Sequence, residues 1–262
     1  MTSNPEWGER TSGLEVAKVF AKQIEGRNVL ITGVAPRGVG EGTAVAFASQ
    51  RPKNLLLVSR TPEKIEAVAS SIRAQYPEVS VKVITMDLAS QASIRKAAAA
   101  VAEVIDTLDI LINNAGATYL YLRFHDYNFE GNEIPEEERP FPNMPPAFAK
   151  VHDDGYMPTI AYAQSKTANI LFTVYLQKHL KPRGIASYAV HPGSVTTHLG
   201  RQHDEEMADA ISKVSDYWKT IDEGAATSLV AALDPKLSGG ISEALAREFQ
   251  RRGLPVFATA RS

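Results

Sequence analysis

Tyr162 and Lys166 are the residues of this 262-residue chain whose types and spacing most directly suggest chemistry. They stand four positions apart in the segment YAQSK, a spacing that puts both side chains on one face of a helix. A nearby ammonium favours the phenolate and lowers a tyrosine pKa from about 10 toward neutrality. Tyr162 could then act as a general acid or base. Because Tyr-x-x-x-Lys is common and often structural, this interpretation depends on the elements that position the pair.

A glycine-rich segment, TGVAPRGVGEG (32–42), has the composition of a phosphate-binding loop. It follows the apolar run NVLIT (28–32), which predicts a buried strand, and opens a predicted helix at 40–50. Glycines let the backbone approach a pyrophosphate, and the helix N-terminus offers free N–H groups to it. A glycine pattern alone also fits an ordinary tight turn, so it is the strand–loop–helix context that favours nucleotide binding.

Polar residues after the next two predicted strands indicate which nucleotide would bind. An acid after the second strand (54–59) would bind a ribose 2′-hydroxyl, but here Ser59 is followed by Arg60, with Lys64 one helical turn later. Cations at this place suit a 2′-phosphate, hence NADP rather than NAD. The alternative is that both are solvated surface charges. Asp87, just past the third strand, could accept from an adenine amino group or be an ordinary acid at a helix start.

The elements that would carry these residues alternate along the chain. Buried strands are predicted at 28–32, 54–59, 79–85 and 108–113, and helices at 40–50, 61–75 and 90–105. This alternation predicts an α/β fold, a Rossmann-like doubly wound parallel sheet covered on both faces. Further helices are predicted at 11–24, 159–180 and 222–233, and a further strand at 185–190.

Composition limits the classes of function. The chain is 44% hydrophobic with a net charge of −2, which suits a single domain over 1–262 and gives no basic surface for nucleic acid. With no cysteine, disulfides and cysteine-bound metals are excluded, and no metal is expected. The opening residues are polar and unlike a signal peptide, and no apolar run approaches the roughly 18 residues of a transmembrane segment. We therefore expect a cytoplasmic protein.

Taken in order, five motifs of this chain resemble those of the short-chain dehydrogenase/reductase family. Besides the glycine loop, MDL and YAQSK, the segments LINNAG (111–116) and HPGSVTT (191–197) match family motifs. The resemblance covers roughly residues 14–236. Within the family, NFEG, YAQSKTANILF and HPGSVTT are most similar to the retinol-dehydrogenase and WW-domain-oxidoreductase-like branch.

The resemblance implies an NADP-dependent oxidoreductase that interconverts a carbonyl and a primary or secondary alcohol on a small, apolar substrate. Tyr162 would be the acid/base, and Lys166 would bind the nicotinamide ribose and lower the Tyr162 pKa. Helix 159–180 would form a homodimer interface, by analogy only. The residues implied to line NADP are Gly33, Gly38, Val39, Gly40, Arg60, Lys64, Asp87, Asn114, Tyr162, Lys166, Val195 and Thr197.

Three departures from the family pattern qualify this assignment. The glycine loop carries one residue more than usual, so Pro36 and Arg37 are predicted to bulge and Arg37 to reach the 2′-phosphate. The family follows NNAG with a helix bearing a catalytic Asn and a fifth strand ending in a catalytic Ser; here the interval is mostly proline-rich loop, so these are predicted to be missing. Thr118 carries the hydroxyl nearest to the expected nicotinamide position. Ser165 is no substitute for the missing Ser, because helical geometry turns its side chain away from that of Tyr162.

The third departure is the tail 237–262, which is atypical. It resembles the opening of another short-chain enzyme, and a helix with Ile241, Leu245 and Phe249 inward followed by a short strand is predicted. With the N-terminal extension 1–26, it flanks the cofactor-binding region. Two alternatives to an active oxidoreductase therefore remain: a catalytically impaired nucleotide-binding pseudoenzyme, and a remnant produced by a misread gene boundary.

Overall fold

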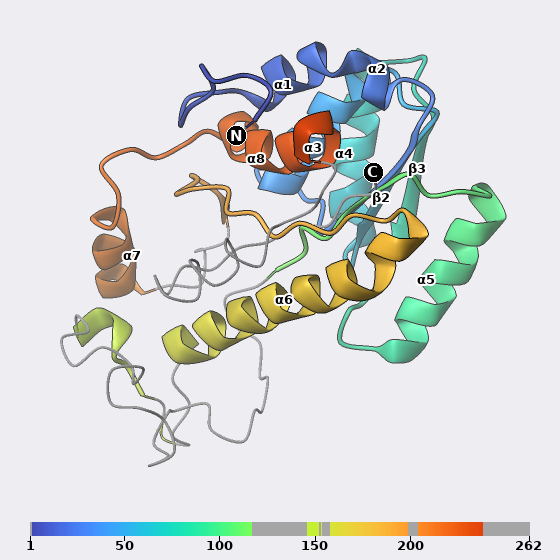
Figure 1. Ribbon diagram of the computed structural model, residues 1–262. Helices are drawn as coiled ribbons and strands as arrows, with labels where there is room; N and C mark the ends of the chain where they lie inside the picture. The colour runs from blue at the N-terminus through green and yellow to red at the C-terminus, as the bar shows by residue number, and fades with distance from the viewer. Residues whose placement is uncertain (1, 117–145, 152, 154–157, 199–203, 238–262) are drawn as a thin grey trace.

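The computed structural model describes residues 2–116, 146–151, 153, 158–198 and 204–237 (Figure 1). Within these residues a four-stranded parallel sheet has the order β3-β2-β1-β4. Its strands are β1 (Asn28–Thr32), β2 (Asn54–Ser59), β3 (Val81–Thr85) and β4 (Ile110–Ile112). The predicted Rossmann-like sheet is thus confirmed. The described sheet stops at β4, which agrees with the predicted lack of a fifth strand.

Successive strand residues face opposite sides of the sheet, and each side packs against helices. Leu30, Leu56, Val58 and Ile84 pack with Ala97 and Ile105 at and beside α5. The alternate residues Val29, Ile31, Leu55, Leu57 and Ile112 pack in a larger cluster with side chains of α1, α3, α4 and α8. Since both faces are buried, the strands read as continuous apolar runs in the sequence.

The helices form two layers around the sheet (Figure 1). One layer holds α1 (Gly13–Val19), α2 (Ala21–Ile24), α3 (Val39–Ala48), α4 (Pro62–Gln75) and α8 (Ile221–Leu233). Opposite lie α5 (Gln91–Val104) and the long α6 (Pro158–Leu180). The shorter elements are η2 (Pro146–Phe148), η3 (Lys181–Arg183), α7 (Glu205–Ser212) and η5 (Pro235–Leu237).

Local capping explains where several helices begin. The Ser12 hydroxyl accepts from the Glu15 amide and caps the start of α1. Pro62 occupies the first turn of α4, where its fixed φ suits the helix. At α8, Thr220 and Glu223 form a capping box, in which each side chain accepts from the other's backbone N–H.

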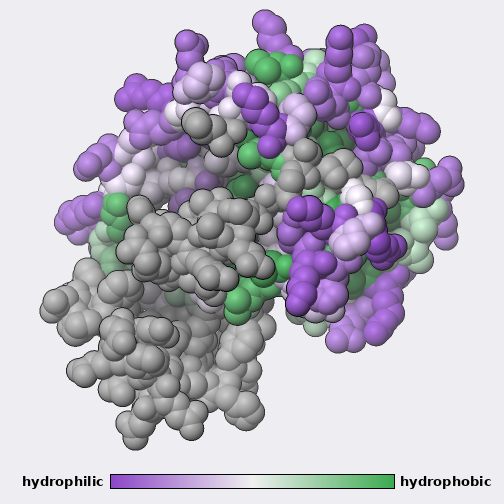
Figure 2. Space-filling model, in the orientation of Figure 1, coloured by the Kyte–Doolittle hydropathy of each residue, from purple (hydrophilic) through white to green (hydrophobic). Residues whose placement is uncertain are grey.

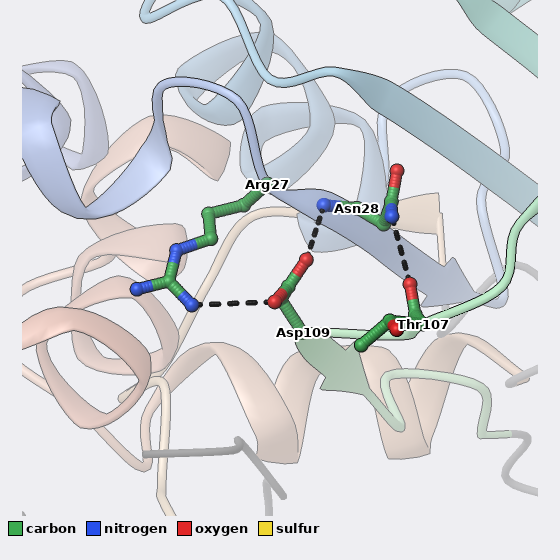
Figure 3. Close-up of polar contacts among 4 residues, drawn as sticks. All are labelled: Arg27, Asn28, Thr107 and Asp109. Carbon is green, nitrogen blue, oxygen red and sulfur yellow. Dashed lines mark hydrogen bonds and ion pairs between the residues drawn. The ribbon is translucent and has the colours of Figure 1, made fainter.

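A polar network fixes the amino ends of the strands (Figure 3). The Asp109 carboxylate accepts from the Asn28 backbone N–H at 2.8 Å and pairs with Arg27 at 3.2 Å. The Asn28 side chain donates to Thr107 O at 2.7 Å and accepts from Asn54 Nδ2 at 2.8 Å. Because Asn28 is 7% exposed, these bonds fix the register of β1 with β2 and β4 away from water.

The first residues of the chain pack against the end of α8. The backbone N–H and hydroxyl of Ser3 both donate to the Asp234 carboxylate, and Trp7 meets Phe20 edge to face. Asp234 is 4% exposed. On the face shown in Figure 2, hydrophilic side chains dominate the described surface, and hydrophobic ones gather in small patches.

Two sequence predictions differ from the structure. Residues 185–190 are not a strand; only Tyr188 forms an isolated bridge, although Ala186, Ser187 and Ala189 are buried as a strand core would be. The described sheet does not include these residues, because a strand is defined by a continuous ladder of hydrogen bonds and not by burial or composition. The helix α7 was not predicted. The predicted loop 132–146, apart from Pro146, and the predicted helix and strand in the tail lie outside the described residues.

Candidate active site

A pocket of about 480 Å³ opens where the carboxyl ends of β1 and β4 meet the N-terminus of α3 and the middle of α6. Ligands of parallel α/β sheets bind at this edge. Its lining comes from six separate stretches of chain. These are Gly33 with 35–39, Lys64, 112–116, Tyr162 with Lys166 and Asn169, 190–193 with Val195, Thr197 and His198, and Ser228.

The glycine loop is packed closely against the end of β4. Gly33 has φ +72°, and a Cβ there would lie 2.4 Å from the Ala115 Cα, so only glycine fits. A Cβ on Gly40 would lie 2.6 Å from Asn114 Nδ2. Gly38 is the N-cap of α3 and offers no side-chain cap, and the Glu41 amide donates to Gly38 O at 3.0 Å, so the N–H groups of Val39 and Gly40 are the ones that suit a ligand.

Asn114 braces the two strand ends. Its Nδ2 donates to Thr32 O at 2.9 Å and to Gly33 O at 3.1 Å. The Thr32 hydroxyl in turn accepts from the Ala115 amide at 3.1 Å. Asn114 lines the pocket, and its amide nitrogen is engaged in holding the glycine loop in place.

The extra residue of the glycine loop places Arg37 in the left-handed region, with φ +60°. Its backbone N–H donates to Glu41 in the first turn of α3 at 2.6 Å. Arg37 and Lys64 are exposed and both line the pocket. Two other predicted contacts, Arg60 and Asp87, are not among the lining residues; an oxygen of Asp87 accepts from the Ala89 amide at 3.0 Å.

Tyr162 and Lys166 face the pocket together from α6, with Lys166 Nζ 5.0 Å from the centre of the tyrosine ring. Burial raises the pKa of Tyr162 and lowers the pKa of Lys166. The Tyr162 pKa is therefore shifted in the direction opposite to the lowering expected from the sequence. The ammonium lies over the ring face, and burial disfavours both charged forms.

The segment 191–198 lines a further side of the pocket and is held by backbone hydrogen bonds to Lys219, which lies just before α8. The Lys219 amide donates to Ser194 O at 2.8 Å, and the Thr196 amide donates to Lys219 O at 2.9 Å. Val195 packs on Gly224 of α8, where a Cβ would lie 2.7 Å from a Val195 methyl. This packing positions Val195 and Thr197 in the lining.

His191 begins the same segment and also lines the pocket. Its Nδ1 accepts from the Gly193 backbone N–H at 2.9 Å. Burial lowers the His191 pKa, and the positive charges of Lys219 and Lys166 lower it further. The imidazole is therefore neutral near pH 7.

Most of the predicted site residues converge on this pocket. The predicted lining residues found there are Gly33, Arg37, Gly38, Val39, Lys64, Asn114, Tyr162, Lys166, Val195 and Thr197. Gly40 lies behind the loop, while Arg60 and Asp87 lie outside the lining. The roles assigned to all of these residues remain predictions.

Sequence reasoning did not single out His191 or Asn169. Asn169 follows Tyr162 by seven positions, so helical spacing could have placed it on the same face. The Ser165 hydroxyl donates to Tyr162 O at 2.7 Å and does not line the pocket, and Thr118 lies outside the described residues. Within the described ranges, no cluster of three His, Asp or Glu residues could hold a metal.

None of the helices in the described part of the chain has both the length and the apolar character needed to cross a bilayer.

Comparison with known proteins places this pocket in a family. The short chain dehydrogenase family model matches residues 27–131. Human retinol dehydrogenase 11 is 33% identical over 238 residues, which is 80% of this chain and 74% of that protein. Human retinol dehydrogenase 12 is 34% identical with the same coverage. The oxidoreductase fscI of Fusarium equiseti is 28% identical over 93% of its length and 70% of this chain.

Solved structures agree on the fold. L-sorbose reductase of Gluconobacter frateurii, solved with NADPH and L-sorbose, has a TM-score of 0.54 at 16% identity, over 83% of this chain and 94% of that one. A double mutant of a Serratia marcescens short-chain dehydrogenase/reductase has a TM-score of 0.60 at 22% identity, over 83% of this chain and 96% of that one. With its glycine loop, its Tyr–Lys helix and these relatives, the chain belongs to the short-chain dehydrogenase family of oxidoreductases, in the retinol-dehydrogenase-like branch.

Proposed function

We propose that the pocket binds NADP(H) and that the chain interconverts a carbonyl and a primary or secondary alcohol on a small, apolar substrate. The observation that carries this proposal is the meeting of Tyr162 and Lys166 with the glycine loop in one pocket. Tyr162, which can transfer a proton, and the glycine loop, whose backbone can bind phosphate, would then act on a substrate and a cofactor bound side by side.

The residues present fit such a cofactor, whose nicotinamide would supply or accept a hydride. The uncapped N-terminus of α3 behind Gly38 suits a pyrophosphate. Arg37 and Lys64 line the pocket as exposed cations and would bind the 2′-phosphate. Val195 and Thr197 would hold the nicotinamide end. The NADPH in the L-sorbose reductase structure supports the same choice.

The protonation state of Tyr162 favours carbonyl reduction. Because burial raises its pKa above 10, the phenol keeps its proton at neutral pH. A phenol is a donor, so Tyr162 gives its proton to the carbonyl oxygen as that oxygen gains negative charge. Lys166, next to the ring, would stabilise the resulting phenolate.

Titration with NADPH, followed by nicotinamide fluorescence, and a turnover screen with small aldehydes and ketones test this proposal. Tyr162→Phe keeps the ring and removes the proton, so we expect NADPH affinity to change little and carbonyl reduction to fall by about 10²–10⁴-fold. Turnover that is indifferent to this substitution would contradict the proposal. If the chain does not bind NADPH in the titration, the proposal fails before turnover is measured. That result would favour the alternative that the chain is a remnant produced by a misread gene boundary.

A second candidate is a nucleotide-binding protein with impaired catalysis. The observation in its favour is that the Ser165 hydroxyl donates to the backbone of its own helix and does not line the pocket, where Ser228 of α8 is the serine among the described lining residues. Tight NADPH binding without turnover of any carbonyl or alcohol would support this alternative.

We also propose that α6 mediates a homodimer. Four of its large apolar side chains are 41–57% exposed: Leu171, Phe172, Val174 and Tyr175. Three of them follow helical spacing, so they form one apolar face of the helix.

A further inference from the structure

His191 has one ring nitrogen already committed. The backbone N–H of Gly193 lies 2.9 Å from its Nδ1, and a backbone N–H can only donate. Nδ1 must therefore carry a lone pair, which excludes both the imidazolium and the tautomer with its proton on Nδ1. The remaining proton is on Nε2, and this nitrogen can only donate a hydrogen bond.

The surroundings enforce the same form. Lys166 and Lys219 both raise the positive potential at the imidazole, and each disfavours a second proton on it. The turn that presents Gly193 is held on its C-terminal side by backbone hydrogen bonds, because the Lys219 amide donates to Ser194 O at 2.8 Å and the Thr196 amide donates to Lys219 O at 2.9 Å. The donor state of His191 is thus built into the loop before any ligand binds.

We propose that the Nε2–H of His191 donates a hydrogen bond to a carbonyl oxygen bound in the pocket beside Tyr162. This inference rests on the proposed function, since it assigns a second donor to the same site. His191 and Tyr162 both line the pocket, and Lys166, one turn from Tyr162, is close enough to act on the imidazole electrostatically.

A second donor matters because one phenol alone leaves a carbonyl oxygen poorly oriented. Preorganised donors aimed at an oxygen that gains charge stabilise the transition state, and removing one typically costs about 10²–10³ in rate. Two carbonyl groups would come within reach: that of the substrate and that of the nicotinamide carboxamide. The chemistry required of His191 is the same for both.

The first measurement is independent of activity. ¹⁵N chemical shifts of the imidazole at pH 7, assigned by comparison with His191→Phe, report which nitrogen carries the proton. We expect the Nε2–H tautomer in the full chain. A proton on Nδ1, or an imidazolium, would overturn the proposal whether or not the chain turns over any substrate.

The second measurement uses a matched pair of variants. His191→Phe keeps a ring but removes both nitrogens, whereas the carbonyl of His191→Asn can still accept from the amide two residues on and its NH₂ can donate. We expect His191→Phe to lose about 10²–10³-fold in kcat/KM for carbonyl reduction and His191→Asn to recover much of that loss. His179→Phe, on α6 and outside the pocket lining, should match the wild type.

NADPH titration of the same variants identifies the oxygen. Unchanged NADPH affinity with lowered kcat/KM assigns the contact to the substrate carbonyl, and a parallel loss of NADPH affinity assigns it to the carboxamide. If His191→Phe matches the wild type in both measurements, His191 is not a donor. If the wild type binds NADPH without turnover, the proposed function fails; weaker NADPH binding by His191→Phe then still supports this proposal through the carboxamide, and unchanged NADPH affinity overturns it as well.

Discussion

At the scale of single residues, the proposed preference for NADP(H) can be tested at three cations. Arg37 and Lys64 both line the pocket, but Arg60, which the sequence also predicted to bind the 2′-phosphate, does not. A hydrogen bond to a charged group contributes about 1.5–3 kcal/mol, or roughly 10–100-fold in affinity. Arg37→Ala and Lys64→Ala should each weaken NADPH binding by about tenfold at least, with Arg60→Ala having less effect.

The matched control for these variants is NADH, which lacks the 2′-phosphate. Its affinity, measured by the same fluorescence titration, should not respond to either substitution. Equal losses for NADH and NADPH would mean that Arg37 and Lys64 support the loop and do not read the phosphate.

Most pocket residues could be predicted from the sequence, because each of their motifs is contiguous in the chain and lies at the end of a predicted strand or the start of a predicted helix. Gly33, Gly38 and Asn114 were found in this way. The direction of the Tyr162 pKa could not be predicted, because burial depends on segments remote in the chain. The tautomer of His191 likewise follows from a backbone turn that its sequence motif does not reveal.

At the scale of elements, the network at the amino ends of the strands should carry measurable stability. Asn28→Ala removes the bonds to Thr107 O and Asn54 and leaves the half-buried Asn54 donor without this partner. We expect a loss of about 1–3 kcal/mol in the free energy of unfolding, measured by denaturant titration.

Arg27→Ala is the control for that substitution. The substitution removes the ion pair with Asp109. Because the Arg27 side chain is 51% exposed, we expect the free energy of unfolding to fall by only about 0–1 kcal/mol. Equal losses for the two variants would show that Asn28 does not fix strand register and that the ion pair matters as much.

The strands β1 and β2 were predicted at their observed bounds because both are apolar runs ended by turn residues. Residues 185–190 have a similar composition and 186–189 are buried, yet a strand is defined by its ladder of hydrogen bonds to a neighbour, which composition alone does not reveal. The helix α7 was missed although Asp204 caps it and acids fill its first turn. Its eight residues are too few for a clear apolar period.

At the scale of the whole molecule, the apolar face of α6 predicts self-association. Light scattering after gel filtration should give the mass of two chains, and Leu171→Glu with Tyr175→Glu should shift it toward one, because charges placed in an apolar interface lose their hydration. Lys22→Glu makes a comparable charge change on α2, in the helix layer on the opposite side of the sheet, and should not affect the mass. A single-chain mass for the wild type would exclude the dimer.

The bond between Ser3 and Asp234 joins residues that are 231 positions apart, so the segment around Ser3 is translated well before the residue that holds it. During synthesis this segment has no docking place until the helix that precedes Asp234 has left the ribosome. The segment around Ser3 therefore docks only after all four described strands have been made, although it precedes them in the chain.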